Sequence, residues 1–259
     1  MSAKIKVFTF NLRVEAKVDG INIFDNRRGR ILDTIREYSP DVIGFQEAND
    51  KMREWLIDSL SDYFVVGCGR LGDWRGESTV LAFKKHMFEM ISLENRWLSA
   101  TPDIPGSTFG GDQSSCPRMF TAVLLKHREA EKPFIFLNTH LDHKSEPARV
   151  KQIQVLLDFI EARCRDYPVV LSGDFNTTPT SDVYKTVLKS FLSDSADVAM
   201  QVKRASTFTN YGKSNKTLDY LFVNAAKMSV ASYDVCNEKI NGDFPSDHHP
   251  VLIKYIIND

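Results

Sequence analysis

The chain has few cysteines, and none lie close enough together in sequence to indicate a structural zinc site. Structural zinc is held by clustered Cys or His ligands, so the spacing argues against that class. The even number permits two disulfides, but a chain of 259 residues does not need cross-links. We therefore expect reduced, mostly buried thiols in a cytoplasmic protein. The cysteines are Cys68, Cys116, Cys164 and Cys236.

The sequence also lacks an excess of one charge and any long hydrophobic run. Its 33 basic and 34 acidic residues leave a net charge of −1, which argues against a dedicated binder of duplex DNA or of anionic membranes. The sequence contains no run of about 18 apolar residues, the length needed to span a bilayer, and no signal peptide is visible. We expect no membrane insertion and favour a monomer.

Short runs rich in Val, Ile and Phe recur along the whole chain and predict many β-strands. Several are apolar at nearly every residue, which is typical of strands covered on both faces. No low-complexity tract, charge block or repeat separates them, so we predict a single domain over residues 1–259. The runs are residues 5–10, 41–46, 64–68, 79–83, 121–126, 134–139, 169–172, 218–223, 229–235 and 251–256.

Helical patterns lie between some of these strands. One apolar stripe follows Asn49, a typical N-cap residue, and a longer stripe follows Ser145. A third helix is predicted over residues 30–38, ending before Pro40. Many strands, few helices and mixed connections predict an α/β (α+β) layered fold rather than regular alternation. Residues 99–115 are predicted to form a long surface loop of the kind that often carries function.

Polar residues interrupt or follow several of the apolar strands. Ligand and metal sites commonly gather where strand ends meet at one edge of a sheet, so we expect these side chains to converge. They are Asn11, Gln46, Glu47, Asn138, His140, Asp174, Asn176 and Asp219.

The segment Gly173-Asp174-Phe175-Asn176 follows one buried strand. In an extended segment, positions i and i+2 face the same way, so Asp174 and Asn176 are expected to address one bound water or phosphate together. The alternative is a turn in which both side chains hydrogen-bond the backbone.

Glu47 ends a second strand. Mg²⁺ usually takes only one or two protein carboxylates and keeps water and substrate phosphate as its other ligands, so a single glutamate here could serve as a Mg²⁺ ligand. A solvated charge or a helix cap is the alternative. His140 and Asp142 are expected to share a strand face, either with His143 in a His/Asp/His cluster that binds a transition metal or in a hydrogen-bonded structural role. Asp219 lies inside an apolar strand, which is costly unless it is paired; His248 would be its partner.

Taken in order, these motifs resemble those of the endonuclease/exonuclease/phosphatase superfamily, and the resemblance covers residues 5 to 256. Each motif is short, but six in the correct order are specific. They are Asn11, Gln46-Glu47, Asn138-Thr139-His140-Leu141, Gly173-Asp174-Phe175-Asn176, Leu218-Asp219-Tyr220 and Ser246-Asp247-His248-His249-Pro250.

The resemblance implies a four-layer α/β/β/α sandwich of two packed mixed sheets and a Mg²⁺-dependent phosphoester hydrolase, with Mn²⁺ as a substitute. Glu47 would be the principal metal ligand, with Asn11 and Asp247 close to the ion.

By the same resemblance, Asp174 would orient or deprotonate the attacking water and Asn176 would hold the water or the phosphate. His248, oriented by Asp219, would stabilise the phosphorus centre. His140 would contact the phosphate or assist the leaving group, supported by Glu77 as in some members of the family.

Other interpretations remain beside this one. Arg118, just before a strand, is either a bidentate phosphate ligand or a surface arginine. The expected substrate is a nucleotide, a nucleic acid or a small phosphorylated molecule. A catalytically inactive binding module would show erosion at Glu47, Asp174 or the Asp219/His248 pair, and none is seen. A zinc hydrolase would need several neutral His ligands, whereas the site is rich in oxygen.

Overall fold

The computed structural model describes residues 4–258 as two β-sheets with helices on their outer faces. The first sheet contains β1 (Lys4–Asn11), β2 (Val42–Gln46), β3 (Tyr63–Val66), β4 (Leu81–Lys84), β10 (Gln201–Lys203), β12 (Met228–Val235) and β13 (Val251–Ile257). The second contains β5 (Phe88–Trp97), β6 (Met119–His127), β7 (Phe134–His140), β8 (Val169–Asp174), β9 (Ser193–Asp194) and β11 (Asp219–Val223). The helices are η1 (Lys17–Asn22), α1 (Phe24–Tyr38), α2 (Asp50–Ser59), α3 (Glu146–Arg163), α4 (Asp182–Leu188) and α5 (Ser195–Val198).

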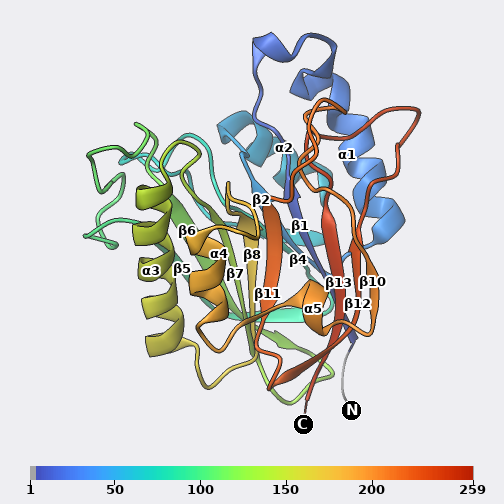
Figure 1. Ribbon diagram of the computed structural model, residues 1–259. Helices are drawn as coiled ribbons and strands as arrows, with labels where there is room; N and C mark the ends of the chain where they lie inside the picture. The colour runs from blue at the N-terminus through green and yellow to red at the C-terminus, as the bar shows by residue number, and fades with distance from the viewer. Residues whose placement is uncertain (1–3, 259) are drawn as a thin grey trace.

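Four layers result, as the sequence predicts (Figure 1). Side chains such as Val7 and Phe136 fill the space between the two sheets, because both faces of these strands are apolar. Ile31 of α1 and Met52 of α2 pack against the outer face of the first sheet. Leu156 of α3 packs against the outer face of the second. The predicted α/β/β/α sandwich is confirmed.

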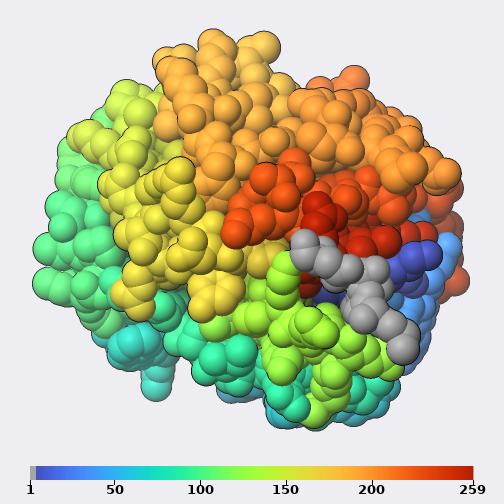
Figure 2. All heavy atoms as spheres, turned by 90° about the horizontal axis from the view of Figure 1, so that it is seen from below, coloured from blue at the N-terminus to red at the C-terminus, as the bar shows by residue number. Residues whose placement is uncertain are grey.

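The strand directions bring the predicted site residues to one edge. β1 runs parallel to β2, with Asn11 beside Gln46, and β7 runs parallel to β8, with His140 beside Asp174. β11 is antiparallel to β8, so it begins at the same edge. The start of β1 and the end of β13 lie side by side at the opposite end (Figure 2).

Several local predictions are confirmed. The Asn49 side chain accepts a hydrogen bond from the Met52 N–H at 3.0 Å, and the Ser145 hydroxyl accepts one from the Ala148 N–H at 3.1 Å. The segment between β5 and β6 is a long loop without helix or strand. Within residues 4–258, no helix is both long and apolar enough to cross a membrane.

The predicted start of the first helix is wrong, because α1 begins at Phe24 rather than at residue 30. One residue on its buried face is Arg27, which a pattern of apolar residues does not reveal. The Arg27 guanidinium is fully buried and donates to the carbonyl oxygens of Leu12, Arg13 and Pro245 at 2.6 to 2.9 Å. These bonds join the segments that follow β1 and precede β13.

The strand β5 was also missed by the sequence patterns. It lies at the edge of the second sheet, and most of its middle residues are exposed or half-buried. Charged residues such as Glu89, Glu94 and Arg96 therefore interrupt its apolar pattern. The helix α4 is only seven residues long, which is too short for a clear helical period.

Candidate active site

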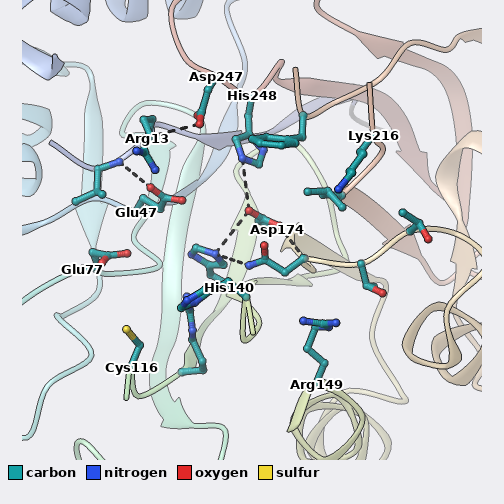
Figure 3. A pocket seen from close by; sticks show the side chains of 18 of the residues that line it. Arg13, Glu47, Glu77, Cys116, His140, Arg149, Asp174, Lys216, Asp247 and His248 are labelled. Atoms are coloured by element: carbon teal, nitrogen blue, oxygen red, sulfur yellow. Dashed lines mark hydrogen bonds and ion pairs between the residues drawn. The ribbon is translucent and has the colours of Figure 1, made fainter. Parts of the chain in front are cut away.

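Eight of the predicted site residues line one pocket of about 940 Å³ at the shared sheet edge (Figure 3). The other two, Asn11 and Asp219, lie directly behind it and hydrogen-bond to members of the lining. The lining members are Glu47, Glu77, Arg118, His140, Asp174, Asn176, Asp247 and His248.

The predicted pairing of Asp219 with His248 is present. His248 Nδ1 lies 2.8 Å from Asp219 Oδ2, and both side chains are buried. Burial alone would lower the pKa of His248, but the charge and hydrogen bond of Asp219 outweigh it and raise this pKa to about 10. The imidazole is therefore charged at neutral pH, with its Nε2 turned towards Asp174 at 3.8 Å.

Thr207, which no sequence motif identifies, holds the two halves of this pair together. Its buried hydroxyl accepts hydrogen bonds from the N–H groups of Leu218 and Asp219 at 2.9 and 3.0 Å. Its carbonyl accepts from the His249 N–H at 2.6 Å. One residue thus fixes the backbone on both sides of the contact between Asp219 and His248.

Thr207→Val is expected to lower kcat about tenfold with little change in KM, because a small displacement of a catalytic group slows the chemical step. The variant keeps the shape of the side chain but leaves two backbone N–H groups without an acceptor, which costs about 1–3 kcal/mol of stability. Steady-state kinetics and thermal unfolding measure the two effects. Thr209→Val is the matched control, since the Asp247 carbonyl it contacts also accepts from two backbone N–H groups. Equal kinetics for the two variants would contradict the positioning role.

Asp174 lies at the centre of the site. Its Oδ2 accepts a hydrogen bond from Asn11 Nδ2 at 2.9 Å and lies 3.6 Å from His140 Nε2. Burial and the charge of Asp219 raise the pKa of Asp174 to about 7. A carboxyl group with this pKa exchanges protons near neutral pH, as a general base requires.

The neighbouring Gly173 allows this placement. It has a φ of +153°, and a Cβ atom there would lie 2.2 Å from the carbonyl oxygen of Thr139. The absence of a side chain therefore lets β8 pass close to β7 beneath the pocket.

Asn176 reaches the same pocket by a different route from the one the sequence predicts. The chain is not extended here: Asn176 has a φ of +50°, and its N–H donates to Asp174 Oδ1 at 2.8 Å. The segment forms a turn, which is the alternative to the predicted extended chain, and this turn still directs both side chains into the pocket. Asn176 Nδ2 donates to the Leu141 carbonyl and lies 2.9 Å from His140 Nε2.

His140 is neutral in this arrangement, because burial and the charge of Arg118 hold its pKa well below the ordinary value. The prediction that Asp142 shares its strand face is wrong, since β7 ends at His140. The Asp142 carboxylate instead accepts hydrogen bonds from the backbone of Lys144 and Ser145. Asp142 is therefore a loop-forming residue.

Glu47 and Asn11 form the acidic side of the pocket. Glu47 Oε1 accepts from Asn11 Nδ2 at 3.0 Å, and Oε2 accepts from the Val14 N–H at 2.7 Å. Burial would raise the pKa of Glu47, but the Val14 hydrogen bond and the charge of His248 hold it below the ordinary value. Glu47 is thus an ionised carboxylate at the pocket wall.

The donor atoms fit a hard divalent ion. Glu47, His140 and Asp174 offer ligand atoms that all lie within 4.8 Å of one another. Asp247 lines the same pocket outside this cluster, and burial raises its pKa. Carboxylate oxygens with one imidazole and no thiolate suit Mg²⁺ or Mn²⁺ better than a structural zinc site.

Two predicted roles are not seen in the geometry. Glu77 does not support His140 through a hydrogen bond or ion pair: its carboxylate pairs with Arg70 at 2.6 Å. Arg118 is buried rather than on the surface, and its guanidinium group is not open for a bidentate contact. Its Nη2 contacts His143 Nδ1 at 2.9 Å, while its Nε and Nη1 are buried without a partner in residues 4–258. Arg118 therefore does not present two exposed nitrogens for a bidentate phosphate contact.

Sequence reasoning missed several cations and an aromatic ring of the lining. None of them belongs to a strand-end motif, so only the folded chain brings them together. Phe208 packs against the His248 ring with centroids 4.9 Å apart. The missed lining residues include Arg13, Arg70, Arg149, Phe208 and Lys216.

Comparison with known proteins gives the family. The sequence profile of the endonuclease/exonuclease/phosphatase family matches residues 8–248. The chain belongs to this family. Endonucleases, exonucleases and phosphatases all hydrolyse phosphoric esters, so the chain is an enzyme of that class. The alternative of an inactive binding module is set aside.

Three relatives cover nearly the whole chain. The uncharacterized protein L388 of Acanthamoeba polyphaga mimivirus is 28% identical over 89% of this chain and 91% of its own length. The crystal structure of a family member from Bacteroides thetaiotaomicron is 26% identical, with a TM-score of 0.93 and full coverage of both chains. A mannosyl-6-phosphatase from the same organism is 26% identical, with a TM-score of 0.90, over 97% of this chain and 99% of its own.

Proposed function

We propose that this enzyme is a Mg²⁺-dependent phosphoester hydrolase that acts on a nucleotide, nucleic-acid or small phosphorylated substrate. The observation that carries the proposal is the position of Asp174. This buried carboxyl group lies between two imidazoles, one neutral and one charged, and shares Asn11 with the carboxylate of Glu47. A general base beside an anion-stabilising cation and an oxygen-rich metal site is what phosphoester hydrolysis requires.

Glu47 would be the principal ligand of the metal, with Asp247 and Asn11 close to it. In the structure Asn11 directs its amide nitrogen to both Glu47 and Asp174, so it spaces the two carboxylates. A divalent ion bound here would polarise the phosphoryl oxygens and offset the negative charge of the substrate. Mn²⁺ would substitute for Mg²⁺, because both prefer oxygen ligands.

Asp174 and the side chains around it would activate the attacking water and stabilise the transition state. Asp174 accepts a proton from the attacking water, and Asn176 Oδ1 accepts a second hydrogen bond that orients this water. His248, charged by its contact with Asp219, stabilises the negative charge that develops on the phosphoryl group. His140, at 3.6 Å from Asp174, contacts the phosphate or the leaving group.

Similarity to the mannosyl-6-phosphatase supports a small phosphorylated substrate. The balanced net charge of −1 also favours a small substrate over a long nucleic acid, which draws its affinity from many basic contacts. Arg118 contacts His143 and lines a small pocket together with His140. It would therefore act through these two histidines rather than bind the phosphate directly with two nitrogens.

Glu47→Gln is expected to raise the Mg²⁺ concentration for half-maximal activity at least about tenfold, because it removes the ionised oxygen ligand. Activity titrations with Mg²⁺ on metal-free protein give this concentration. Glu54→Gln, on the exposed face of α2, is the control and should match the wild type. An unchanged Mg²⁺ requirement in Glu47→Gln would show that the metal binds elsewhere.

A further inference from the structure

The pocket has two chemically different sides, and the proposed reaction uses only one of them. Figure 3 shows Glu47, Glu77 and Asp247 towards one side, with Lys216 and Arg149 on the other. A volume of about 940 Å³ is at the upper end of the range for small-molecule sites and far exceeds one phosphate group. The basic side therefore has room for another part of the substrate.

Lys216 is the free cation of this side. Its side chain is exposed and forms no hydrogen bond or ion pair within residues 4–258, and its amino group points into the pocket. Its backbone is fixed, because Lys216 and Phe208 exchange N–H···O hydrogen bonds of 3.1 and 2.9 Å. A held backbone with a free ammonium group is suited to meet a charged ligand.

Arg149 faces Lys216 from the start of α3. Its guanidinium is largely buried and is held in place by the Asp142 carbonyl at 2.8 Å and by Glu146 at 2.7 Å. Thr178 and Ser181, each with a hydroxyl group, also line the pocket. Hydroxyl, guanidinium and ammonium donors together match the several acceptor oxygens of a phosphate group.

Lys216 differs from the other cations of the lining in having no acidic partner within residues 4–258. Three cations are matched by neighbouring acids: Arg70 by Glu77 at 2.6 Å, Arg149 by Glu146 at 2.7 Å, and Arg13 by Asp19 at 2.9 Å. Of the remaining acids of the lining, Glu47 and Asp247 lie at the proposed metal site, and Asp174 faces the charged His248 at 3.8 Å. The nitrogens of Arg118 are covered by protein or by His143. Lys216 thus remains accessible and uncompensated.

We propose that the basic side is a second phosphate subsite and that the substrate carries two phosphate groups. One is hydrolysed beside Asp174 and His248, and the other pairs with Lys216 and accepts hydrogen bonds from Arg149, Thr178 and Ser181. This inference rests on the proposed function, because the first phosphate defines where the second one lies.

The test compares matched substrates with one and two phosphates in the presence of Mg²⁺. Adenosine 3′,5′-bisphosphate is paired with adenosine 3′- and 5′-monophosphates, and fructose 1,6-bisphosphate with fructose 1- and 6-phosphates. In each productive pair the wild type is expected to prefer the bisphosphate. Lys216→Met should lower kcat/KM for the bisphosphate at least about tenfold, mainly through KM, and leave the monophosphate within about twofold. Lys213→Met, an exposed neighbour outside the pocket lining, should leave both unchanged.

An equal loss on both substrates of a pair would place Lys216 at the scissile phosphate and overturn the second subsite. The absence of any preference for the bisphosphate would overturn it as well. Binding of the same bisphosphates to Asp174→Asn, measured by calorimetry with and without Lys216→Met, tests the subsite without turnover. Weakened binding with no hydrolysis of any phosphoester by the wild type would keep the subsite and reject the proposed function.

Discussion

Asp174→Asn is expected to lower kcat/KM about 10³-fold or more, because it removes the group that accepts the proton of the attacking water. The amide keeps the shape of the side chain and its contact with the Asn176 N–H, but it does not act as a base. The loss should appear in kcat at saturating Mg²⁺, and added metal should not restore it. Rates of ester cleavage for the variant and the wild type give the ratio.

The same variant is expected to fold as well as the wild type. Burial and Asp219 raise the pKa of Asp174 to about 7, so the charged carboxylate opposes folding as the pH rises through that value. An uncharged amide avoids this cost, which offsets the lost hydrogen bond from Asn11. The melting temperature of the metal-free variant at about pH 8 should therefore lie within about 3 °C of the wild type.

Asp194→Asn is the matched control for this substitution. Asp194 is also a buried acid with a pKa raised by burial, and it accepts hydrogen bonds from Tyr184 Oη and the Ala196 N–H. It does not line the pocket. Full activity in Asp194→Asn with loss in Asp174→Asn would locate the effect at the site. Near-normal activity in Asp174→Asn would mean that another group is the base.

His248→Asn is expected to lower kcat/KM about 10²- to 10³-fold, because it removes the cation that stabilises the transition state. His249→Asn provides the control, since this adjacent histidine is equally buried but contacts the Ser206 carbonyl outside the pocket. Its activity should stay close to that of the wild type. Equal losses in the two variants would point to a disturbed loop instead of a lost charge.

Asp219→Asn should reproduce most of the His248 effect, and the double variant should be no slower than the worse single one, because the two residues act as one unit. Without the Asp219 charge, burial dominates and the pKa of His248 falls. The Asp219→Asn activity should therefore decline between about pH 6 and about pH 9, where the wild-type imidazole stays charged. Parallel pH profiles for both proteins would contradict this role of Asp219.

Strand-end motifs predict much of this site because they depend on local sequence. Apolar strands that end in Asn11, Glu47, His140 and Asp174 point to one sheet edge, and the two parallel strand pairs bring them there. The predicted reason was wrong for Asn176, where a turn replaces an extended chain. The outcome was the same, since a turn and an alternating strand both return the side chain to the pocket.

Residues that act across the fold are outside the reach of such patterns. Arg27 binds three carbonyl groups from two distant segments, and Thr207 joins the segments of Asp219 and His249. In sequence, the first is a charged residue in a helix and the second an ordinary threonine. Lys216 likewise becomes a pocket residue only through the fold. Catalytic residues at strand ends can be predicted from sequence. Residues that position the catalytic groups or select the substrate are brought to the site by long-range contacts, which local patterns do not reveal.

The most direct measurement is ester cleavage by metal-free protein across a panel of phosphoesters, in EDTA and after addition of Mg²⁺ or Mn²⁺. The panel includes single- and double-stranded nucleic acid, mono- and dinucleotides, sugar and inositol phosphates, and sphingomyelin. We predict cleavage of at least one phosphoester that is absent in EDTA, restored by Mg²⁺ and lost in Asp174→Asn. Full activity in EDTA, unchanged activity in Asp174→Asn, or no cleavage of any phosphoester with any metal would contradict a metal-dependent hydrolase centred on Asp174.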